Sequence, residues 1–310
     1  MTRRIRWIRG DAAYCETQRT VDRQFLFKPD PVVRNIIGQA AGRALEKYPV
    51  KIYWLDFNIN HKHCGKAPLS DSPEHLENMV KFDRLFHSLL ARGINKHLKR
   101  EGPLFSGRNR SDEARDDESL AQQLFYAVTN PVKDGLVENV SQWKGFSSYE
   151  QLATGKIERY WYIDWAAWYE AGGERSKQSP ETFIRWTEVR LTPLPGWEGM
   201  PAAKRQALFR RGVKELEGMY AERRKRERLT VVGPRKLAAL DPRERPKLPA
   251  EVNPRPRCHA STAEAAAEYE EQLGEFMERY RRASQLYLAG ARNVRFPPGS
   301  YRPPLISVVT

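Results

Sequence analysis

The sequence predicts an α+β fold in which one antiparallel sheet is flanked by helices and a mostly helical region follows. Short segments rich in β-branched and aromatic residues alternate with longer segments whose apolar residues recur at helical spacing. After residue 155 the composition shifts, and proline-punctuated segments favour helices at 202–228 and 261–290. We therefore expect two units, residues 1–155 with the sheet and residues 156–310 as a helical accessory region.

The first elements are expected to be a strand, a helix and a second strand. Residues 12–19 favour a short strand. A helix follows from Pro31, because Asp30 is a residue type that caps helix N-termini and proline is tolerated in the first helical turn. Pro49 ends this helix. Residues 50–63 are rich in β-branched and aromatic side chains and predict one long strand, with a polar loop after it.

Two longer helices complete the first unit. Residues 73–100 carry apolar side chains at helical spacing on one side and basic side chains on the other. A basic connection leads to a helix over 112–130, which Pro131 and Gly135 are expected to end. Strands alternating with helices in this way indicate one sheet covered by helices.

The charge of the chain points to an anionic partner. It carries 53 Lys and Arg against 39 Asp and Glu, a formal net charge of +14. Such a surplus attracts nucleic acid first and an anionic membrane second. No run of about 18 apolar residues occurs, and the N-terminal segment lacks the apolar stretch of a signal peptide. The three cysteines are widely spaced and predict no disulfide framework. We therefore expect a cytoplasmic protein with no membrane partner.

The pair His61-Lys62-His63 is the first candidate for chemistry. Side chains alternate along a strand, so His61 and His63 project from the same face and can converge on one divalent cation. Two incidental strand histidines, or one arm of a zinc site, would give the same pattern. The cysteines are too scattered to complete a recognisable zinc spacing.

Tyr126 is the second candidate. The apolar stripe of its expected helix includes Leu124 and Val128, and Tyr126 lies about 200° around the helix from each of them. It therefore points away from the buried stripe, and Gln122 and Asn130 share its face. A plain surface tyrosine would show the same pattern.

The histidine pair and Tyr126 together indicate phosphodiester chemistry more strongly than either does alone. A tyrosine hydroxyl with a pKa near 10 is a poor nucleophile at neutral pH. A cation held by two histidines can polarise a phosphodiester and stabilise the charge that develops on it. Attack by the phenol would leave a covalent phosphotyrosine bond that can later be rejoined.

The segment from Tyr14 to Leu152 resembles the REP-associated tyrosine transposases, which are single-tyrosine transposases of the HUH type, and their insertion-sequence relatives. In that family a strand ends in Asn-His-hydrophobic-His, and the nucleophile helix ends in Tyr-Ile-x-x-Asn-Pro-Val-x-x-Gly-Leu-Val; a Trp-x-x-Ser-Ser stretch follows. The corresponding residues here are Asn60-His61-Lys62-His63, Tyr126-Ala-Val-Thr-Asn130-Pro-Val-Lys-Asp-Gly135-Leu-Val137 and Trp143-Lys-Gly-Phe-Ser147-Ser148-Tyr149.

The resemblance implies a ferredoxin-like αβ domain that cleaves single-stranded DNA and stays attached to the 5′ phosphate through Tyr126. It implies Mg²⁺ or Mn²⁺ held by His61 and His63, with a third ligand from the tyrosine helix. Asn130, one turn after Tyr126, is our candidate for that ligand. The implied partner is single-stranded or hairpin DNA, and the resemblance leaves a homodimer open.

Two further sets of residues are candidates for contacts with DNA. Basic side chains on the second helix and in the connection after it are expected to contact phosphates, although a solvated helix face would look the same. These side chains are Arg92, Lys96, Lys99, Arg100, Arg108 and Arg110. The aromatic run over 159–169 could stack unpaired bases, but the spacing of Trp161, Trp165 and Tyr169 favours a buried seam between domains.

The sequence therefore predicts an enzyme that nicks and rejoins single-stranded DNA through Tyr126, with a metal at His61 and His63. The alternative is a non-catalytic protein that binds DNA hairpins with the same fold. The arrangement of the three side chains discriminates between them, because the enzyme needs them at one site.

Overall fold

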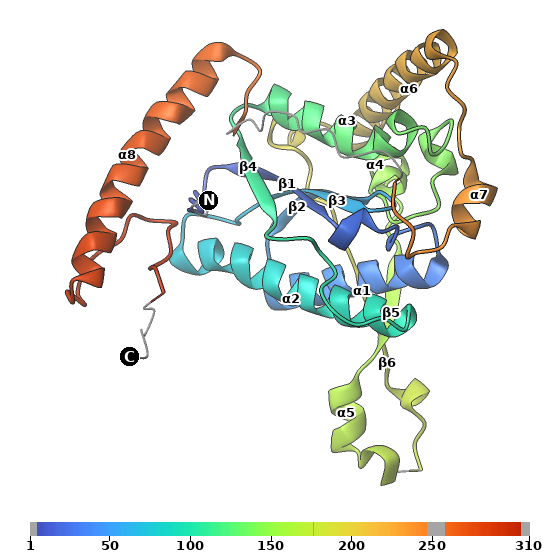
Figure 1. Ribbon diagram of the computed structural model, residues 1–310, viewed down its shortest axis with the longest axis horizontal. Coiled ribbons are helices and arrows are strands. Elements are labelled where there is room, and N and C mark those ends of the chain that lie inside the picture. Colours follow the sequence, from blue (N-terminus) through green and yellow to red (C-terminus); the bar gives the residue numbers. More distant parts are fainter. Residues whose placement is uncertain (1–4, 176, 247–257, 305–310) are drawn as a thin grey trace.

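The computed structural model describes residues 5–175, 177–246 and 258–304 (Figure 1). A five-stranded sheet with the order β2-β3-β1-β4-β7 forms its centre. Every neighbouring pair is antiparallel except β4 and β7, which are parallel. The strands are β1 (Ala13–Arg19), β2 (Lys51–Phe57), β3 (His61–Ala67), β4 (Arg110–Ala114) and β7 (Cys258–His259).

Helices cover both faces of the sheet. On one face, α1 (Pro31–Lys47) and α2 (Pro73–His97) enclose a core that includes Tyr14 of β1. On the other face, α3 (Asp117–Lys133) packs on the neighbouring β1 residues Ala13 and Cys15. This separation follows from the alternation of side chains along the strand. The antiparallel sheet flanked by helices is therefore confirmed.

The expected helix after Asp30 is confirmed. The Asp30 carboxylate accepts hydrogen bonds from the backbone N–H groups of Val32 and Val33, and α1 begins at Pro31. Two of the first four N–H groups, which have no partner within the helix, are satisfied in this way.

The prediction of one long strand over 50–63 is wrong. The chain forms two antiparallel strands, β2 and β3, with a tight turn between them in which Asn58 N–H donates to the carbonyl of His61. The polar loop expected after His63 is instead the second half of β3, which runs to Ala67. Asparagine is a typical turn residue, and Asn58 and Asn60 flank this turn. The sequence-based prediction gave their apolar neighbours too much weight.

The prediction around residues 112–130 is also corrected. The expected start of the helix at Asp112 lies in strand β4, and α3 begins at Asp117 with the Asp116 side chain as its N-cap. The helix continues through Pro131 to Lys133. Proline costs only its own hydrogen bond here, and Asp134 N–H still donates to the Asn130 carbonyl.

The chain beyond residue 155 packs directly on the first part. Phe209 of α6 (Ala202–Glu227) stacks on Phe125 of α3 with ring centroids 5.7 Å apart. The boundary at residue 155 stays a prediction, and the two parts share a hydrophobic core. The remaining α-helices of the described residues are α4 (Tyr149–Thr154), just before this boundary, and α5 (Trp165–Glu170), α7 (Pro234–Ala239) and α8 (Ala263–Leu288) after it.

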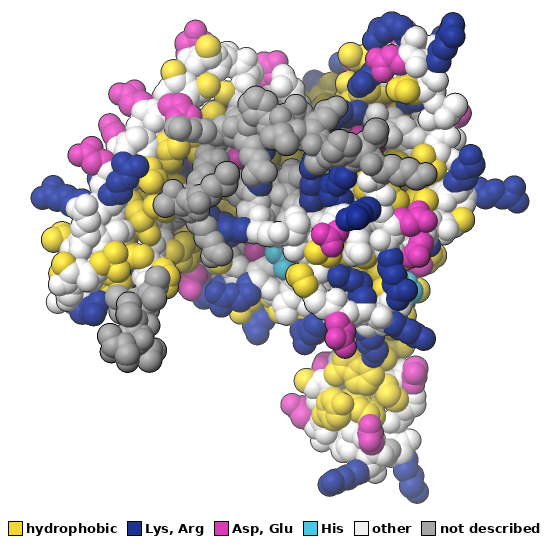
Figure 2. Space-filling view, in the orientation of Figure 1, with side chains coloured by type: hydrophobic (Ala, Val, Ile, Leu, Met, Phe, Trp, Pro, Cys, Tyr) yellow, Lys and Arg dark blue, Asp and Glu magenta, His cyan; other side chains and the backbone are white. Residues whose placement is uncertain are grey.

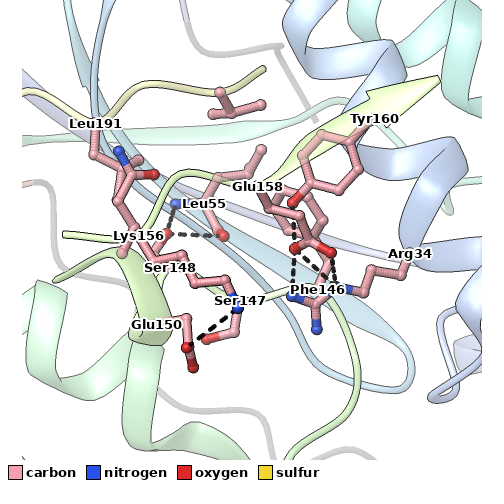
Figure 3. Close-up of a pocket in the computed structure, with 12 residues that line it drawn as sticks. Arg34, Leu55, Phe146, Ser147, Ser148, Glu150, Lys156, Glu158, Tyr160 and Leu191 are labelled. Atoms are coloured by element: carbon pink, nitrogen blue, oxygen red, sulfur yellow. Dashed lines mark hydrogen bonds and ion pairs between the residues drawn. The ribbon is translucent and has the colours of Figure 1, made fainter. Parts of the chain in front are cut away.

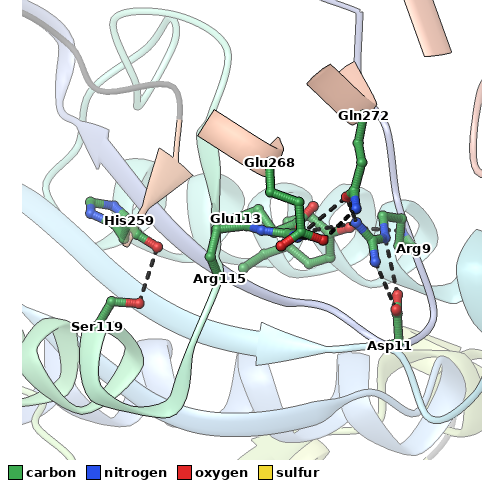
Figure 4. Close-up of polar contacts among 9 residues, drawn as sticks. Arg9, Asp11, Glu113, Arg115, Ser119, His259, Glu268 and Gln272 are labelled. Atoms are coloured by element: carbon green, nitrogen blue, oxygen red, sulfur yellow. Dashed lines mark hydrogen bonds and ion pairs between the residues drawn. The ribbon is translucent and has the colours of Figure 1, made fainter. Parts of the chain in front are cut away.

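Strand β7 and helix α8 close the far edge of the sheet (Figure 4). Gln272 of α8 accepts hydrogen bonds from Arg9 at 2.7 Å and from Arg115 at 3.2 Å. Arg115 also forms an ion pair with Glu113 of β4. The N-cap of α8 is Thr262, whose hydroxyl accepts a hydrogen bond from Ala265 N–H, so the helix begins two residues after the start expected at residue 261.

A two-stranded hairpin and a short helix project from the body (Figure 1). Strands β5 (Arg159–Ile163) and β6 (Ile184–Glu188) pack on α1, and α5 lies between them in sequence. The preference for a buried aromatic seam is wrong: Trp161, Trp165 and Tyr169 are 45%, 43% and 65% exposed. Trp161 lies in strand β5, whereas Trp165 and Tyr169 lie in helix α5, so helical spacing does not place the three rings on one face.

Candidate metal and nucleophile site

The register of the sheet places the two histidines. His61 is paired with Arg19 and His63 with Thr17 on the neighbouring strand β1. Both imidazoles project toward α3, with ring centroids 4.9 Å apart. The intervening Lys62 points to the opposite face, where its ammonium is buried 3.5 Å from the Glu16 carboxylate. The apolar layer on that face therefore contains an ion pair.

Each histidine is oriented through its Nδ1 atom. His61 Nδ1 lies 2.7 Å from Asn60 Oδ1, and the Asn60 amide nitrogen donates to the Arg23 carbonyl. Because Asn60 Oδ1 can only accept, His61 carries its proton on Nδ1 and leaves an Nε2 lone pair. His63 Nδ1 lies 3.0 Å from the Thr17 hydroxyl, which can accept in the same way. Both Nε2 atoms are then available as ligands.

Asn130 of α3 faces both Nε2 atoms. One atom of its amide lies 3.0 Å from His63 Nε2 and 3.3 Å from His61 Nε2. The other amide atom lies 2.8 Å from Asp134 Oδ2. A carboxylate accepts hydrogen bonds, so the Asn130 nitrogen belongs on the Asp134 side and its oxygen on the histidine side. The Asn58 amide nitrogen at 3.1 Å favours the reverse, but a bond to a charged group is the stronger one.

Tyr126 lies beside this group on the same helix. Its ring is perpendicular to the His63 ring, with centroids 5.5 Å apart, and its side chain is 36% exposed. The Lys133 ammonium donates a hydrogen bond to the Tyr126 hydroxyl at 3.1 Å and lies 4.4 Å from the ring centroid. The prediction that Tyr126 points away from the buried stripe is confirmed.

The electrostatic setting keeps the histidines neutral. Burial lowers the pKa of His61 to about 3, and the cations of Arg19 and Lys133 add to the effect. Burial also lowers the pKa of His63 well below its usual value, with His61 and Lys133 contributing. A neutral imidazole is the form that binds a metal ion, so protons do not compete for these ligands at pH 7.

The donor set is two imidazole nitrogens and one amide oxygen. Within residues 5–175, 177–246 and 258–304, no group of three or more His, Cys, Asp or Glu side chains could hold a metal ion. Asn130 is the side chain of α3 whose amide lies near both histidine Nε2 atoms, which makes it the candidate for a third donor.

The predicted phosphate contacts are divided between the two faces of the sheet. Arg110 of β4 is paired with Thr17, on the face of the histidines, and forms an ion pair with Asp112; Arg108 is exposed just before β4. Four side chains instead belong to the layer formed by α1 and α2, behind the sheet as seen from the site. They are Arg92, Lys96, Lys99 and Arg100.

Several residues around the site were not predicted from the sequence, and Thr17, Arg19 and Lys133 show why. Thr17 and Arg19 join the histidines through the register of β1, which no local pattern reveals. Lys133 is seven residues after Tyr126, so two turns of helix place it on the same face. That spacing could have identified it.

The Ser147-Ser148 stretch is bonded to strand β2, and Figure 3 shows the Ser148 side chain beside the backbone of Leu55. Ser147 donates from its hydroxyl to the buried Asp56 carboxylate at 2.6 Å, and Ser148 N–H donates to the same oxygen at 3.0 Å. Trp143 Nε1 donates to the Phe57 carbonyl at 3.2 Å. These bonds hold the end of β2, and with it the turn that leads to His61.

The sequence matches no family model and no curated protein. Among solved structures, one of a REP-associated tyrosine transposase bound to a REP hairpin is similar to this chain, with 18% identity and a TM-score of 0.39. The match covers 50% of this chain and 87% of that one. A likeness at this level carries no assignment of function. Among the helices of the described residues, none has the length and apolarity that a membrane crossing requires.

Proposed function

We propose that this protein nicks and rejoins single-stranded DNA, free or next to a hairpin, through a covalent 5′-phosphotyrosine at Tyr126. One observation carries the proposal: the Tyr126 ring, the His61 and His63 imidazoles and the Asn130 amide meet at one point between β3 and α3. An enzyme of this kind needs these side chains at one site, so their arrangement supports the proposal over the non-catalytic alternative.

The covalent step balances without a further reactant. The Tyr126 oxygen attacks the phosphorus, the bond from phosphorus to the 3′ oxygen breaks, and the phenolic proton leaves to solvent while the 3′ oxygen gains one. Attack by a 3′ hydroxyl on the phosphotyrosine reverses the reaction. Lys133, which donates to the Tyr126 hydroxyl, orients the nucleophile and offsets its developing charge.

A divalent cation at His61, His63 and Asn130 would supply Lewis-acid activation of the phosphodiester. Because imidazole and carbonyl donors are both present, the donor set suits Mn²⁺ at least as well as Mg²⁺. The protein's own contribution is orientation: Asn60, Thr17 and Asp134 fix the three donors from behind.

The topology supports the same proposal. The order β1-α1-β2-β3-α2-β4, with β1 and β3 at the centre of that part of the sheet, matches the β-α-β-β-α-β order expected of a ferredoxin-like domain and supports that part of the proposal. In this pattern β3 is a central strand, so its two histidines lie on a rigid element.

The experiment uses labelled single-stranded oligonucleotides with and without a hairpin, in the presence of Mn²⁺. The wild-type protein should form a DNA adduct that survives SDS, and Tyr126→Phe should form none while it binds DNA nearly as well. His61→Ala should lose both the adduct and Mn²⁺ binding measured by calorimetry.

The matched control is Tyr169→Phe, because Tyr169 is an exposed tyrosine outside the site. It should form the adduct at the wild-type rate. An adduct in Tyr126→Phe would refute the assignment of the nucleophile. Tight hairpin binding by wild type with no adduct in any metal would favour the non-catalytic alternative.

A further inference from the structure

A groove between α1, α2 and β5 carries basic and aromatic side chains that the proposed reaction does not use. It encloses about 330 Å³, and its walls include Arg43 and Lys47 of α1 and Tyr162 of β5. The Arg43 guanidinium lies 4.3 Å from the centroid of the Tyr162 ring. A cation and a flat ring therefore lie together at the wall of an open hollow.

The same combination recurs at the adjacent end of α2. The Lys96 ammonium lies 5.3 Å from the centroid of the Trp165 ring, which is 43% exposed. Arg92, one turn before Lys96, is close enough to Arg43 that the two like charges interact. Within the described residues, neither Arg92 nor Lys96 forms an ion pair. We call the set Arg43, Lys47, Arg92, Lys96, Tyr162 and Trp165 the α1–α2–β5 surface.

The charge of this surface is positive. Its four cations stand against the carboxylates of Glu46, which lines the groove, and Asp164, which caps α5 and lies 3.9 Å from Arg185. Figure 2 shows Lys and Arg side chains gathered where the projection leaves the body. Beyond that point, the figure shows a hydrophobic surface with acidic groups on both sides. The excess positive charge is thus at the junction.

Cations interleaved with exposed rings suit a single-stranded nucleic acid. Cations attract phosphates, and a flat exposed ring offers a stacking face to an unpaired base. A duplex presents few base faces to such rings, because its bases are stacked on one another. A protein partner would not need the four cations.

We propose that the α1–α2–β5 surface binds a second stretch of single-stranded DNA, with phosphates at Arg92 and Lys96 and a base stacked on Trp165. It lies in the α1–α2 layer, on the face of the sheet opposite to α3 and Tyr126. The choice of DNA rests on the proposed function; the preference for an unpaired strand rests on the surface itself. The strand would then contact both sides of the molecule.

The test measures binding without cleavage. In a Tyr126→Phe background and without metal, fluorescence anisotropy compares an oligothymidylate of about 20 nucleotides with a duplex of that length. Trp165→Leu should lower affinity for the single strand about tenfold and leave duplex affinity nearly unchanged. Lys96→Gln, which changes an exposed side chain, should make the slope of log affinity against log salt shallower by about 0.7.

Two matched variants serve as controls. Trp186→Leu removes another exposed indole, 53% exposed, from the hairpin, and Lys225→Gln removes an exposed cation from α6. Neither should cause the selective loss of single-strand affinity.

Unchanged single-strand affinity in Trp165→Leu, or an equal loss in Trp186→Leu, would overturn the proposal. So would a change in sedimentation with Trp165→Leu, which would assign the surface to a second copy of the chain. If the wild-type protein formed no adduct, the proposed reaction would fail while this binding test remained decisive.

Discussion

At the scale of single residues, the orientation of one amide decides what the site can do. Asn130 can ligate a cation only with its oxygen toward His61 and His63, and Asp134 is the group that holds it so. Asn58 donates to Asp134 Oδ2 at 2.8 Å and so fixes the carboxylate in turn. Asp134 is therefore a positioning residue, because it acts through Asn130.

We predict that Asp134→Leu weakens Mn²⁺ binding by about 10- to 100-fold, the usual effect of removing a group that orients a metal ligand. Asp134→Asn should retain most of the affinity, because its side-chain oxygen can still accept from the Asn130 nitrogen. Titration calorimetry of both variants checks this. Equal affinity in Asp134→Leu and wild type would show that Asn130 is oriented by other contacts or is not a ligand.

The candidate residues that sequence patterns could identify are those with a fixed local period. His61 and His63 are two apart on a strand, and Tyr126 and Asn130 are four apart on a helix. Period two and period 3.6 place each pair on one face whatever the rest of the chain does. Thr17 and Arg19 lie more than forty residues before the histidines in sequence and meet them only through the sheet.

At the scale of elements, α1 shows how a helix accepts a hairpin at close range. A Cβ built on Gly38 would come within 2.3 Å of the Tyr160 ring, and one on Gly42 would come equally close to the Thr187 hydroxyl. The absence of side chains at these two positions lets β5 and β6 lie directly against the helix. Glycine otherwise weakens a helix interior, so its use here follows from the packing.

We predict that Gly38→Ala destabilises the protein by about 1–3 kcal/mol through overpacking, despite the better helix propensity of alanine. Gly218→Ala in α6 is the matched control, since nothing lies within 4 Å of the added carbon. Gly218→Ala should raise the free energy of unfolding by about 0.5–1 kcal/mol. Urea unfolding measures both changes. A stabilised Gly38→Ala would mean that the hairpin moves aside without cost.

The whole molecule is a sheet with two separate apolar cores, and a half-buried histidine with a buried Nε2 atom lies at the edge of one of them. His87 of α2 packs against the rings of Phe86 and Phe105, and its Nε2 atom has no hydrogen-bond partner within the described residues. Burial lowers the pKa of His87 well below its usual value. The unfolded chain therefore binds more protons than the folded one below pH 6.5.

This difference predicts a loss of stability in acid. Above about pH 6.5, His87 does not lower the free energy of unfolding. At pH 5 it lowers this free energy by about 2 kcal/mol if the imidazole of the folded protein stays neutral. His61 and His63 act in the same direction, whereas Asp56, whose pKa burial raises to about 6, acts in the opposite one. Comparing the pH dependence of the free energy of unfolding in the wild type and in a variant without His87 separates the effect of His87 from these other groups.

The variant is His87→Leu, compared with wild type by urea unfolding at pH 7 and pH 5. Between pH 7 and pH 5, the free energy of unfolding of the wild-type protein should fall by about 2 kcal/mol more than that of the variant. Parallel losses in the two proteins would show that His87 becomes protonated without unfolding, by admitting water or a partner to its site.

Local patterns were enough to place helices α1 and α2, the faces of the His61–His63 pair and of Tyr126, and the cap of α1, because periodicity and capping chemistry act within a few residues. The three-dimensional arrangement of the chain decided that residues 50–63 turn back on themselves, that β4 and β7 extend the sheet, and that the rings of Trp161 and Trp165 are exposed. It also decided which basic residues share a face with the histidines. These outcomes depend on strand pairing and on which surfaces are covered by distant parts of the chain, and the energy of such contacts appears in no short window of sequence.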